Sequence, residues 1–424
     1  MSLNSVKNAI LSGKFDKDFS LMYADNKAAQ NRYSKAVDEF GNLFGEREEI
    51  RLFSAPGRTE VGGNHTDHQH GRVLAGSVDL DVIAVTSKNS DNTVRIKSEG
   101  YDMDVIDLNE LEPKKEEYGC ASGLIRGMCA IIKEKGYEIG GFDAYTTSNV
   151  LKGSGLSSSA AFEVLVGVIL SNLFNDGKID PVEIAKIAQK SENIYFGKPC
   201  GLMDQMASSV GGFTGIDFND PKNPIIEKVS FDLAAHGYNL CIVNTGGNHA
   251  DLTGDYAAIT EECREVSNAL GKDFLREVDE NEFKKSIADI RKKCGDRAVL
   301  RAIHFFNDNK RALEEKEALK ANDFNKFLNL INESGCSSFR FLQNVFSVSS
   351  PKEQGLSLAL ALTEEFLGDK GACRVHGGGF AGTIQAFIPS EMLEDYRNMI
   401  EGVFGKGNCY VLNIRPVGGY ALKG

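Results

Sequence analysis

The stretch LKGSGLSSSAAFEVLVGVIL, residues 151–170, decides the fold of this chain. Its second half is apolar nearly all round, which predicts a buried helix. The first backbone N–H groups of a helix have no partner within it, and the helix dipole favours negative charge there. Glycines let a phosphate approach the backbone, and serine hydroxyls add donors or a metal ligand. We therefore expect a phosphate-binding loop, with a flexible Gly/Ser linker or a cap for the buried helix as the alternatives.

Other catalytic motifs are missing from the sequence. The loop is not a Walker A motif, because no Gly-Lys pair is followed by Ser or Thr. The chain also lacks a protein-kinase catalytic loop and the G-x-S-x-G elbow of serine hydrolases. The sequence therefore favours a phosphate site of another class.

Length and composition narrow the class of protein. A chain of 424 residues is too long for one ordinary core, so we expect two domains. The net charge of -12 argues against a nucleic-acid or anionic-membrane binder. The nine cysteines include no CxxC pair, and neither a secretory leader nor an apolar span of about 18 residues occurs. We expect reduced thiols and a cytoplasmic protein.

Alternating strand and helix patterns predict an α/β or α+β fold. We expect a strand at residues 50–55 and a hairpin between residues 81–86 and 93–96, turning at 89–92. Asp180 followed by Pro181 predicts a helix start. In the second half, the patterns predict a strand at 240–244, helices at 255–270, 280–320 and 323–346, and strands near 383–388 and 409–414.

A dense polar block, RTEVGGNHTDHQH, covers residues 58–70 and holds three of the seven histidines. Zinc needs three or four ligands that converge on one point. In an extended segment, His65 and Asp67 would face one way and His68 and His70 the other, so a tight metal cluster is not expected. We interpret the block as hydrogen-bonding groups for a polyhydroxyl ligand, with His68 and His70 serving the loop itself.

Two carboxylates stand out in residues 192–206. Glu192 follows Ile184 and Ala188 at steps of four, which places it on the buried side of a helix. It could hold magnesium on ATP phosphates, or form a simple salt bridge. Asp204 follows the Pro and Gly breaks of GKPCGLMDQM, where a catalytic group could be mounted or a helix could be capped.

Three ordered motifs, APGRTEVGGNHTDH (55–68), LKGSGLSSSAA (151–161) and RVHGGGFAGTIQAF (374–387), resemble those of the galactokinases in the GHMP small-molecule kinase superfamily. KPCGLMDQ and the pair Asp255-Tyr256 add to the resemblance, which runs from about residue 40 to the C-terminus. It implies an α+β fold, with a ribosomal-protein-S5-like domain at 20–215, a ferredoxin-like domain at 216–424 and the active site in a cleft between them.

The resemblance also implies an activity and roles for individual residues. The expected reaction is ATP-dependent phosphorylation of the anomeric hydroxyl of D-galactose. Ser158 and Glu192 would hold Mg²⁺, and Asp204, paired with Arg58, would be catalytic as a general base or by orienting the hydroxyl. The ATP phosphates would contact Gly153, Ser154, Gly155, Leu156, Ser157, Ser158, Ser159 and Ala160. The sugar would contact Asn64, His65, Asp67, Gly201 and Tyr256.

Two departures from the family pattern concern the sugar. The neutral amide of Asn64 stands where the family carries a carboxylate, and His68 replaces a tyrosine. The alternatives are therefore a related kinase for N-acetylgalactosamine, galacturonate or arabinose, or a non-catalytic sensor of ATP and sugar. The HTD triplet argues against mevalonate and homoserine kinases. We expect a monomer with small-molecule ligands only, and neither a nucleic-acid nor a membrane partner.

Overall fold

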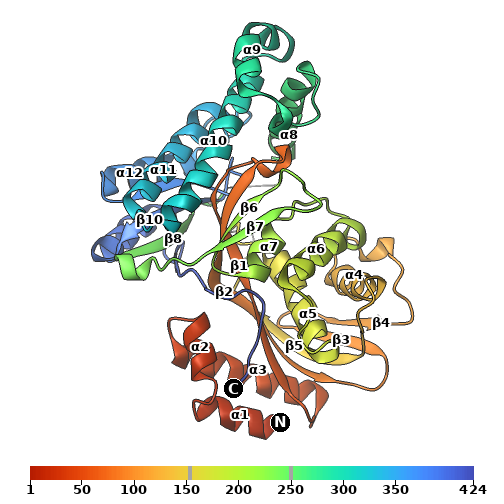
Figure 1. Cartoon of the computed structure of the whole chain (residues 1–424). Helices are drawn as coiled ribbons and strands as arrows, with labels where there is room; N and C mark the ends of the chain where they lie inside the picture. Colours follow the sequence, from red (N-terminus) through yellow and green to blue (C-terminus); the bar gives the residue numbers. More distant parts are fainter. Residues whose placement is uncertain (151–154, 248–251) are drawn as a thin grey trace.

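The computed structural model describes residues 1–150, 155–247 and 252–424 (Figure 1). Within these residues the strands form a mixed sheet of eight and an antiparallel sheet of four. The larger sheet has the order β12-β1-β2-β5-β3-β4, and β6 and β7 extend it from β2. Its strands are β1 (Arg51–Gly62), β2 (Arg72–Lys88), β3 (Thr93–Ser98), β4 (Met103–Asp107), β5 (Phe142–Ser148), β6 (Phe213–Asp217), β7 (Ile225–Val229) and β12 (Tyr420–Ala421).

The predicted hairpin between β2 and β3 is wrong. The chain reverses at residues 89–92, as the turn residues predict, but β5 lies between the two strands. β5 pairs antiparallel with β2 and parallel with β3, and its Phe142 and Ala144 are fully buried. The polar turn sets the direction of β3. Its neighbour is β5, which begins 49 positions after β3 begins, because β5 fills the core.

One face of the larger sheet is covered by α4 (Ala121–Glu134), α5 (Ser158–Phe174), α6 (Pro181–Ser191) and α7 (Met203–Val210). The prediction of a buried helix after the serine loop is confirmed, because α5 is buried on nearly every side. Asp180 caps α6 through a hydrogen bond from the Val182 N–H at 2.8 Å, with Pro181 in the first turn. The start of α6 was therefore predictable from local sequence.

The other face of this sheet carries the N-terminal helices α1 (Leu3–Leu11), α2 (Asp16–Met22) and α3 (Asn26–Phe44). They share a separate core with Ile83 and Val85 of β2, whereas the alternate residues Val82 and Ala84 belong to the core under α5. Both termini lie beside these helices (Figure 1). The Asp18 carboxylate accepts hydrogen bonds from the last two backbone N–H groups at 3.1 and 3.0 Å.

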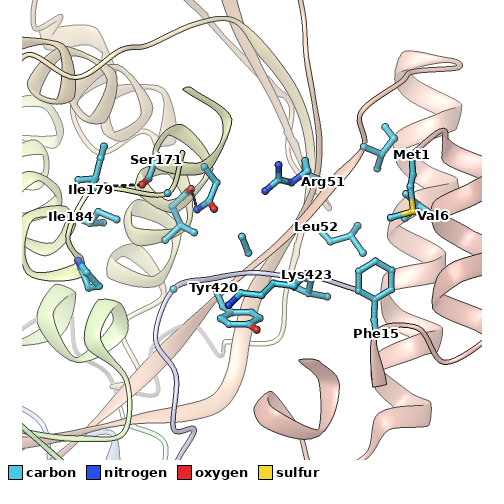
Figure 2. A pocket seen from close by; sticks show the side chains of 18 residues that line it. Met1, Val6, Phe15, Arg51, Leu52, Ser171, Ile179, Ile184, Tyr420 and Lys423 are labelled. Atoms are coloured by element: carbon cyan, nitrogen blue, oxygen red, sulfur yellow. Dashed lines mark hydrogen bonds between the residues drawn. The ribbon is translucent and has the colours of Figure 1, made fainter. Parts of the chain in front are cut away.

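A cavity of about 560 Å³ separates α1 and the C-terminal tail from α5 and α6 (Figure 2). Val6, Phe15 and Leu52 give it apolar walls, and Arg51 and Lys423 place cationic side chains at it. Among the described residues, its lining shares no member with the predicted phosphate or sugar site. The cavity therefore belongs to the junction with the N-terminal helices.

The smaller sheet has the order β11-β8-β10-β9, formed by β8 (Tyr238–Asn244), β9 (Ala372–His376), β10 (Thr383–Pro389) and β11 (Cys409–Leu412). The helices of this half are α8 (Thr253–Ala269), α9 (Glu280–Cys294), α10 (Asp296–Lys320), α11 (Phe324–Ser337), α12 (Gly355–Leu367) and α13 (Leu393–Phe404). The single helix expected at 280–320 is two helices, because Gly295 at φ +87° breaks it.

The long helix α10 joins the two halves, since it contacts β1 and β2 as well as α8, α9 and α11. The predicted boundary between the two domains lies at 215/216. β6 crosses this boundary and β7 follows it, yet both strands belong to the larger sheet. The boundary stays a prediction. In the described part of the chain, no helix is both long and apolar enough to cross a bilayer.

Candidate functional site

The centre of the site is an ion pair between β1 and α7. Arg58 Nε donates to Asp204 Oδ1 at 2.7 Å, and the Arg58 side chain is only 9% exposed. The second Asp204 oxygen accepts a hydrogen bond from the Ser157 hydroxyl. Asp204 is the second residue of α7 and follows the N-cap position, so its carboxylate is directed to Arg58 and Ser157 and does not cap the helix. The structure thus brings three predicted residues together.

Backbone contacts fix the end of the phosphate loop against β1. Arg58 N–H donates to Leu156 O at 3.1 Å, and the Arg58 guanidinium also donates to Gly155 O. A Cβ on Gly57 would lie 2.9 Å from Leu156 O, so only glycine permits this approach. Gly153 and Ser154 lie outside the described residues.

The charges around Asp204 keep it ionised. Burial alone would raise the pKa of the Asp204 carboxyl, but the Arg58 charge and the hydrogen bonds from Arg58 and Ser157 outweigh it and lower the pKa. A carboxylate with a lowered pKa is a weak base. It remains a good acceptor for a substrate hydroxyl at neutral pH.

A second acidic cluster lies beside this pair, where α5, α6 and α7 meet. Glu192 is 2% exposed, as its helical spacing predicted. Its Oε1 lies 3.2 Å from Lys198 Nζ and 3.4 Å from Ser159 Oγ, and its Oε2 accepts from Gln205 Nε2 at 2.7 Å. The hydroxyl that contacts Glu192 is therefore that of Ser159, next to the predicted Ser158.

These groups suit a hard divalent cation. Hydroxyl and carboxylate oxygens are the ligands that Mg²⁺ prefers, and Mg²⁺ is usually held by one or two carboxylates together with substrate phosphates. Glu163 adds a fully buried carboxyl whose Oε1 has no partner among the described residues. Burial and the neighbouring Glu192 raise the pKa of Glu163 well above its usual value. Among the described residues, no group of three or more His, Cys, Asp or Glu could hold a metal unaided.

The predicted sugar residues meet at the glycine turn after β9. Asn64 Nδ2 lies 2.8 Å from Gly377 O, and His65 Nε2 lies 2.9 Å from Gly378 O. The Tyr256 hydroxyl donates to Gly379 O at 2.9 Å. Three successive carbonyl groups thus bind three residues that the sequence had placed in the sugar site.

Asn64 itself is fully buried, and its side chain is engaged inside the chain. Its amide nitrogen also donates to Glu60 at 2.8 Å, and its oxygen accepts from Asn344 at 2.8 Å and Ser338 at 3.2 Å. A direct bond from this amide to a sugar would require these bonds to break. The role of Asn64 in sugar binding stays a prediction.

The histidine block is not extended, because residues 67–69 form a 3-10 turn with His65 and His70 in left-handed backbone conformations. Asp67 instead lies against the loop before α7, where a Cβ on Gly201 would be 2.9 Å from Asp67 Oδ2. Burial and the neighbouring His68 lower the pKa of His65 to about 4, so its imidazole is neutral at pH 7. His70 stacks on Phe274 with ring centroids 3.6 Å apart, which gives it a packing role.

His376 connects the glycine turn to the phosphate loop. Its ring nitrogens lie 3.1 Å from Thr59 Oγ1 and 2.9 Å from Thr383 Oγ1, and a Cβ on Gly155 would be 3.2 Å from the ring. Burial, with Arg58 and Arg374 nearby, lowers its pKa to about 3. The neutral ring therefore packs directly beneath the loop.

The residues around Glu192 were not predicted from the sequence. Glu163 had a signal, since it is the only charged residue in α5. Lys198 and Gln205 lie inside the motif KPCGLMDQ, but nothing in the sequence indicates that their side chains point to Glu192. His376 lies in the third glycine motif, where its burial depends on long-range pairing with β1.

Comparisons with known proteins show which proteins this chain is similar to. Residues 123–212 match the family model "GHMP kinases N terminal domain", and residues 38–88 match "Galactokinase galactose-binding signature". The chain is 32% identical over 374 residues to a galactokinase of Actinobacillus pleuropneumoniae, covering 88% of this chain and 93% of that protein. It is 29% identical to a galactokinase of Streptomyces coelicolor, covering 87% and 92%.

Solved structures confirm the α+β fold. The crystal structure of Lactococcus lactis galactokinase complexed with galactose matches with a TM-score of 0.77 and 26% identity, covering 92% of this chain and 99% of that one. Methanococcus jannaschii mevalonate kinase matches with a TM-score of 0.62 and 15% identity, covering 87% and 99%. The second likeness concerns the fold alone.

Proposed function

Because the chain belongs to the galactokinase family, we propose that it transfers the γ-phosphoryl group of ATP to the anomeric hydroxyl of D-galactose, giving galactose 1-phosphate and ADP. The observation that carries the proposal is the position of the Asp204 carboxylate. It is held by Arg58 Nε at 2.7 Å and by the Ser157 hydroxyl, directly at the start of α5. One acidic group thus stands where a sugar hydroxyl and a phosphoryl group could meet.

Each part of the site has a task in this reaction. The loop 153–160 and the first N–H groups of α5 would bind the ATP phosphates. Glu192, with the hydroxyl of Ser158 or Ser159, would hold Mg²⁺, which neutralises charge on the phosphates when bound. Arg58 would stabilise the charge that develops on the phosphoryl oxygens. Positioning and charge stabilisation supply most of the catalysis in such transfers.

The state of Asp204 favours orientation over strong basicity. Arg58 and Ser157 lower its pKa, so the carboxylate has little affinity for a proton at neutral pH. It can still accept a hydrogen bond from the anomeric hydroxyl and aim it at the phosphorus atom. The proton then passes late to the Asp204 carboxylate, when bonding to phosphorus has made the hydroxyl acidic, and from Asp204 to solvent.

His65, Asp67, Gly201 and Tyr256 would bind the sugar. His65 and Tyr256 contact the glycine turn, Tyr256 from the first turns of α8, and Gly201 lies against Asp67 in the loop before α7. Asn64 favours a second candidate within the same family. The Asn64 amide is already hydrogen-bonded to Glu60, Asn344 and the glycine turn. Another group must therefore recognise the far end of the sugar. The alternative is a 1-kinase for N-acetylgalactosamine, galacturonate or arabinose.

The test is an ADP-release assay with galactose, N-acetylgalactosamine, galacturonate, arabinose and mevalonate, each with and without Mg²⁺. We expect galactose to give the highest kcat/KM and mevalonate to give no turnover. Turnover of another sugar alone would move the assignment within the family. ATP binding without turnover of any sugar would indicate a sensor.

A further inference from the structure

We propose that Lys198 is an exchangeable counter-cation of Glu192: its ammonium group neutralises the buried carboxylate before the metal binds, and Mg²⁺ displaces it. The inference rests on the proposed function, because it takes Glu192 to be the metal ligand. It assigns a role to a residue that the reaction scheme above leaves unused.

The geometry of the pair is asymmetric. Lys198 Nζ lies 3.2 Å from Glu192 Oε1, yet the lysine side chain is 63% exposed and the glutamate side chain 3%. The backbone links them as well, since Lys198 N–H donates to Glu192 O at 3.2 Å. The lysine thus extends from solvent to a carboxylate that would be costly to bury without a cation.

The atom contacted by Lys198 is the one a metal would need. Glu192 Oε2 is already bound by Gln205 Nε2 at 2.7 Å, whereas Oε1 faces both Lys198 and the Ser159 hydroxyl at 3.4 Å. Magnesium binds oxygen at about 2.0–2.1 Å. An ammonium group and a divalent ion on the same oxygen would repel each other strongly in this partly dry site. Lysine and metal therefore compete for Oε1.

The ammonium group of Lys198 forms an ion pair with Glu192, and the Asp204 carboxylate attracts it more weakly. Asp204 has its own partner in Arg58, and Glu163 bonds to Gln205 at 3.2 Å. Among the described residues, Lys198 is the cation that pairs with Glu192. Its flexible four-carbon stem is largely in solvent, so it can leave without disturbing the core.

The direct test is Mn²⁺ binding to the complex of the protein with a non-hydrolysable ATP analogue, measured by electron paramagnetic resonance of the free ion. Removing a competing cation by Lys198→Gln should make Mn²⁺ bind about fivefold tighter, the effect of a partly buried ion pair. The matched control is Lys190→Gln, which removes the exposed pair between Lys190 and Glu134 at 2.7 Å and should leave the affinity unchanged. Equal or weaker Mn²⁺ binding by Lys198→Gln would overturn the proposal.

Thermal unfolding gives a second readout that needs no sugar. Without metal, Lys198→Gln should melt below the wild type, because Glu192 has lost its cation. Saturating Mg²⁺ with a non-hydrolysable ATP analogue should close this gap, and a gap that persists would contradict the exchange. In a Glu192→Gln background the Lys198→Gln change should have no effect on either readout. Neither Mn²⁺ affinity nor thermal unfolding depends on galactose turnover. Failure of the proposed function would therefore be seen in the ADP-release assay, and failure of the exchange in these two measurements.

Lys198→Arg keeps the positive charge, and it can be measured in place of Lys198→Gln if the glutamine variant folds poorly. We expect its Mn²⁺ affinity to stay within about twofold of the wild type, since a guanidinium also competes for Oε1. An arginine variant with tighter Mn²⁺ binding would show that charge is not the competing property.

Discussion

Arg58 Nε lies 2.7 Å from Asp204 Oδ1, and this bond joins residues that are 146 positions apart in the chain. The same guanidinium donates to Gly155 O, so one side chain connects the Asp204 carboxylate to the predicted phosphate loop. The planar fork of arginine makes both contacts possible at once.

Arg58→Lys keeps the positive charge but cannot make both contacts. We expect kcat to fall at least about tenfold, with a smaller change in the KM for galactose, because the lost contacts hold Asp204 and the phosphate loop in position for the transfer. Steady-state ADP release measures both constants. Arg276→Lys changes an ion pair with Asp217 outside the proposed site and should leave kcat unaltered. An unchanged kcat for Arg58→Lys would remove Arg58 from the catalytic centre.

Asn64→Ala tests whether this buried amide serves the fold or the sugar. The amide bonds to Glu60, Gly377, Ser338 and Asn344, so its loss should lower the free energy of unfolding by about 2–4 kcal/mol. Urea unfolding measures this, and the exposed Asn281→Ala should change it by less than about 0.5 kcal/mol. Unchanged stability combined with a large loss of galactose affinity would show that Asn64 contacts the sugar itself.

Glu315→Gln should stabilise the protein increasingly as pH rises. Glu315 is fully buried against Gly62, both its carboxyl oxygens lack partners among the described residues, and burial raises its pKa well above the usual value. The folded protein therefore keeps a proton that the unfolded chain loses above about pH 4.5. Wild-type stability falls with pH in this window by up to about 1.4 kcal/mol per pH unit, and a neutral amide avoids that loss.

The measurement is the difference in unfolding free energy between Glu315→Gln and the wild type at pH 5, 6, 7 and 8. The exposed Glu314→Gln provides the control and should give a flat difference. A flat difference for Glu315→Gln would mean that this carboxyl is ionised in the folded protein.

Local sequence was enough for the parts of the fold that depend on local physics. The buried helix α5, the cap at Asp180 and the burial of Glu192 follow from periodicity and capping rules. The position of β5 between β2 and β3 does not, because strand order depends on which distant apolar strand fills the core. The break at Gly295 carried a signal, since glycine interrupts the helical pattern there.

The candidate site also contains residues that the sequence predicted and residues that it did not. Motif resemblance identified Arg58, Asp204 and Glu192, and the structure brings Arg58 to Asp204 and places Glu192 in the adjoining cluster. The sequence did not indicate that Asn64 would be engaged in the core, since its partners Ser338 and Asn344 are about 280 positions away. Ser159 and Ser158 are adjacent, and only the direction of the first turn of α5 decides which hydroxyl reaches Glu192.

The most direct test uses galactose labelled with ¹³C at its anomeric carbon. The labelled sugar is incubated with the protein, ATP and Mg²⁺, and the product is observed by ¹³C and ³¹P nuclear magnetic resonance. We predict that the labelled carbon acquires coupling to phosphorus as ADP forms. Asp204→Asn should bind galactose but form this product at least about 10² times more slowly, whereas the exposed Asp220→Asn should match the wild type. Phosphate on another carbon, no phosphorylated sugar, or equal rates for Asp204→Asn and the wild type would contradict the account.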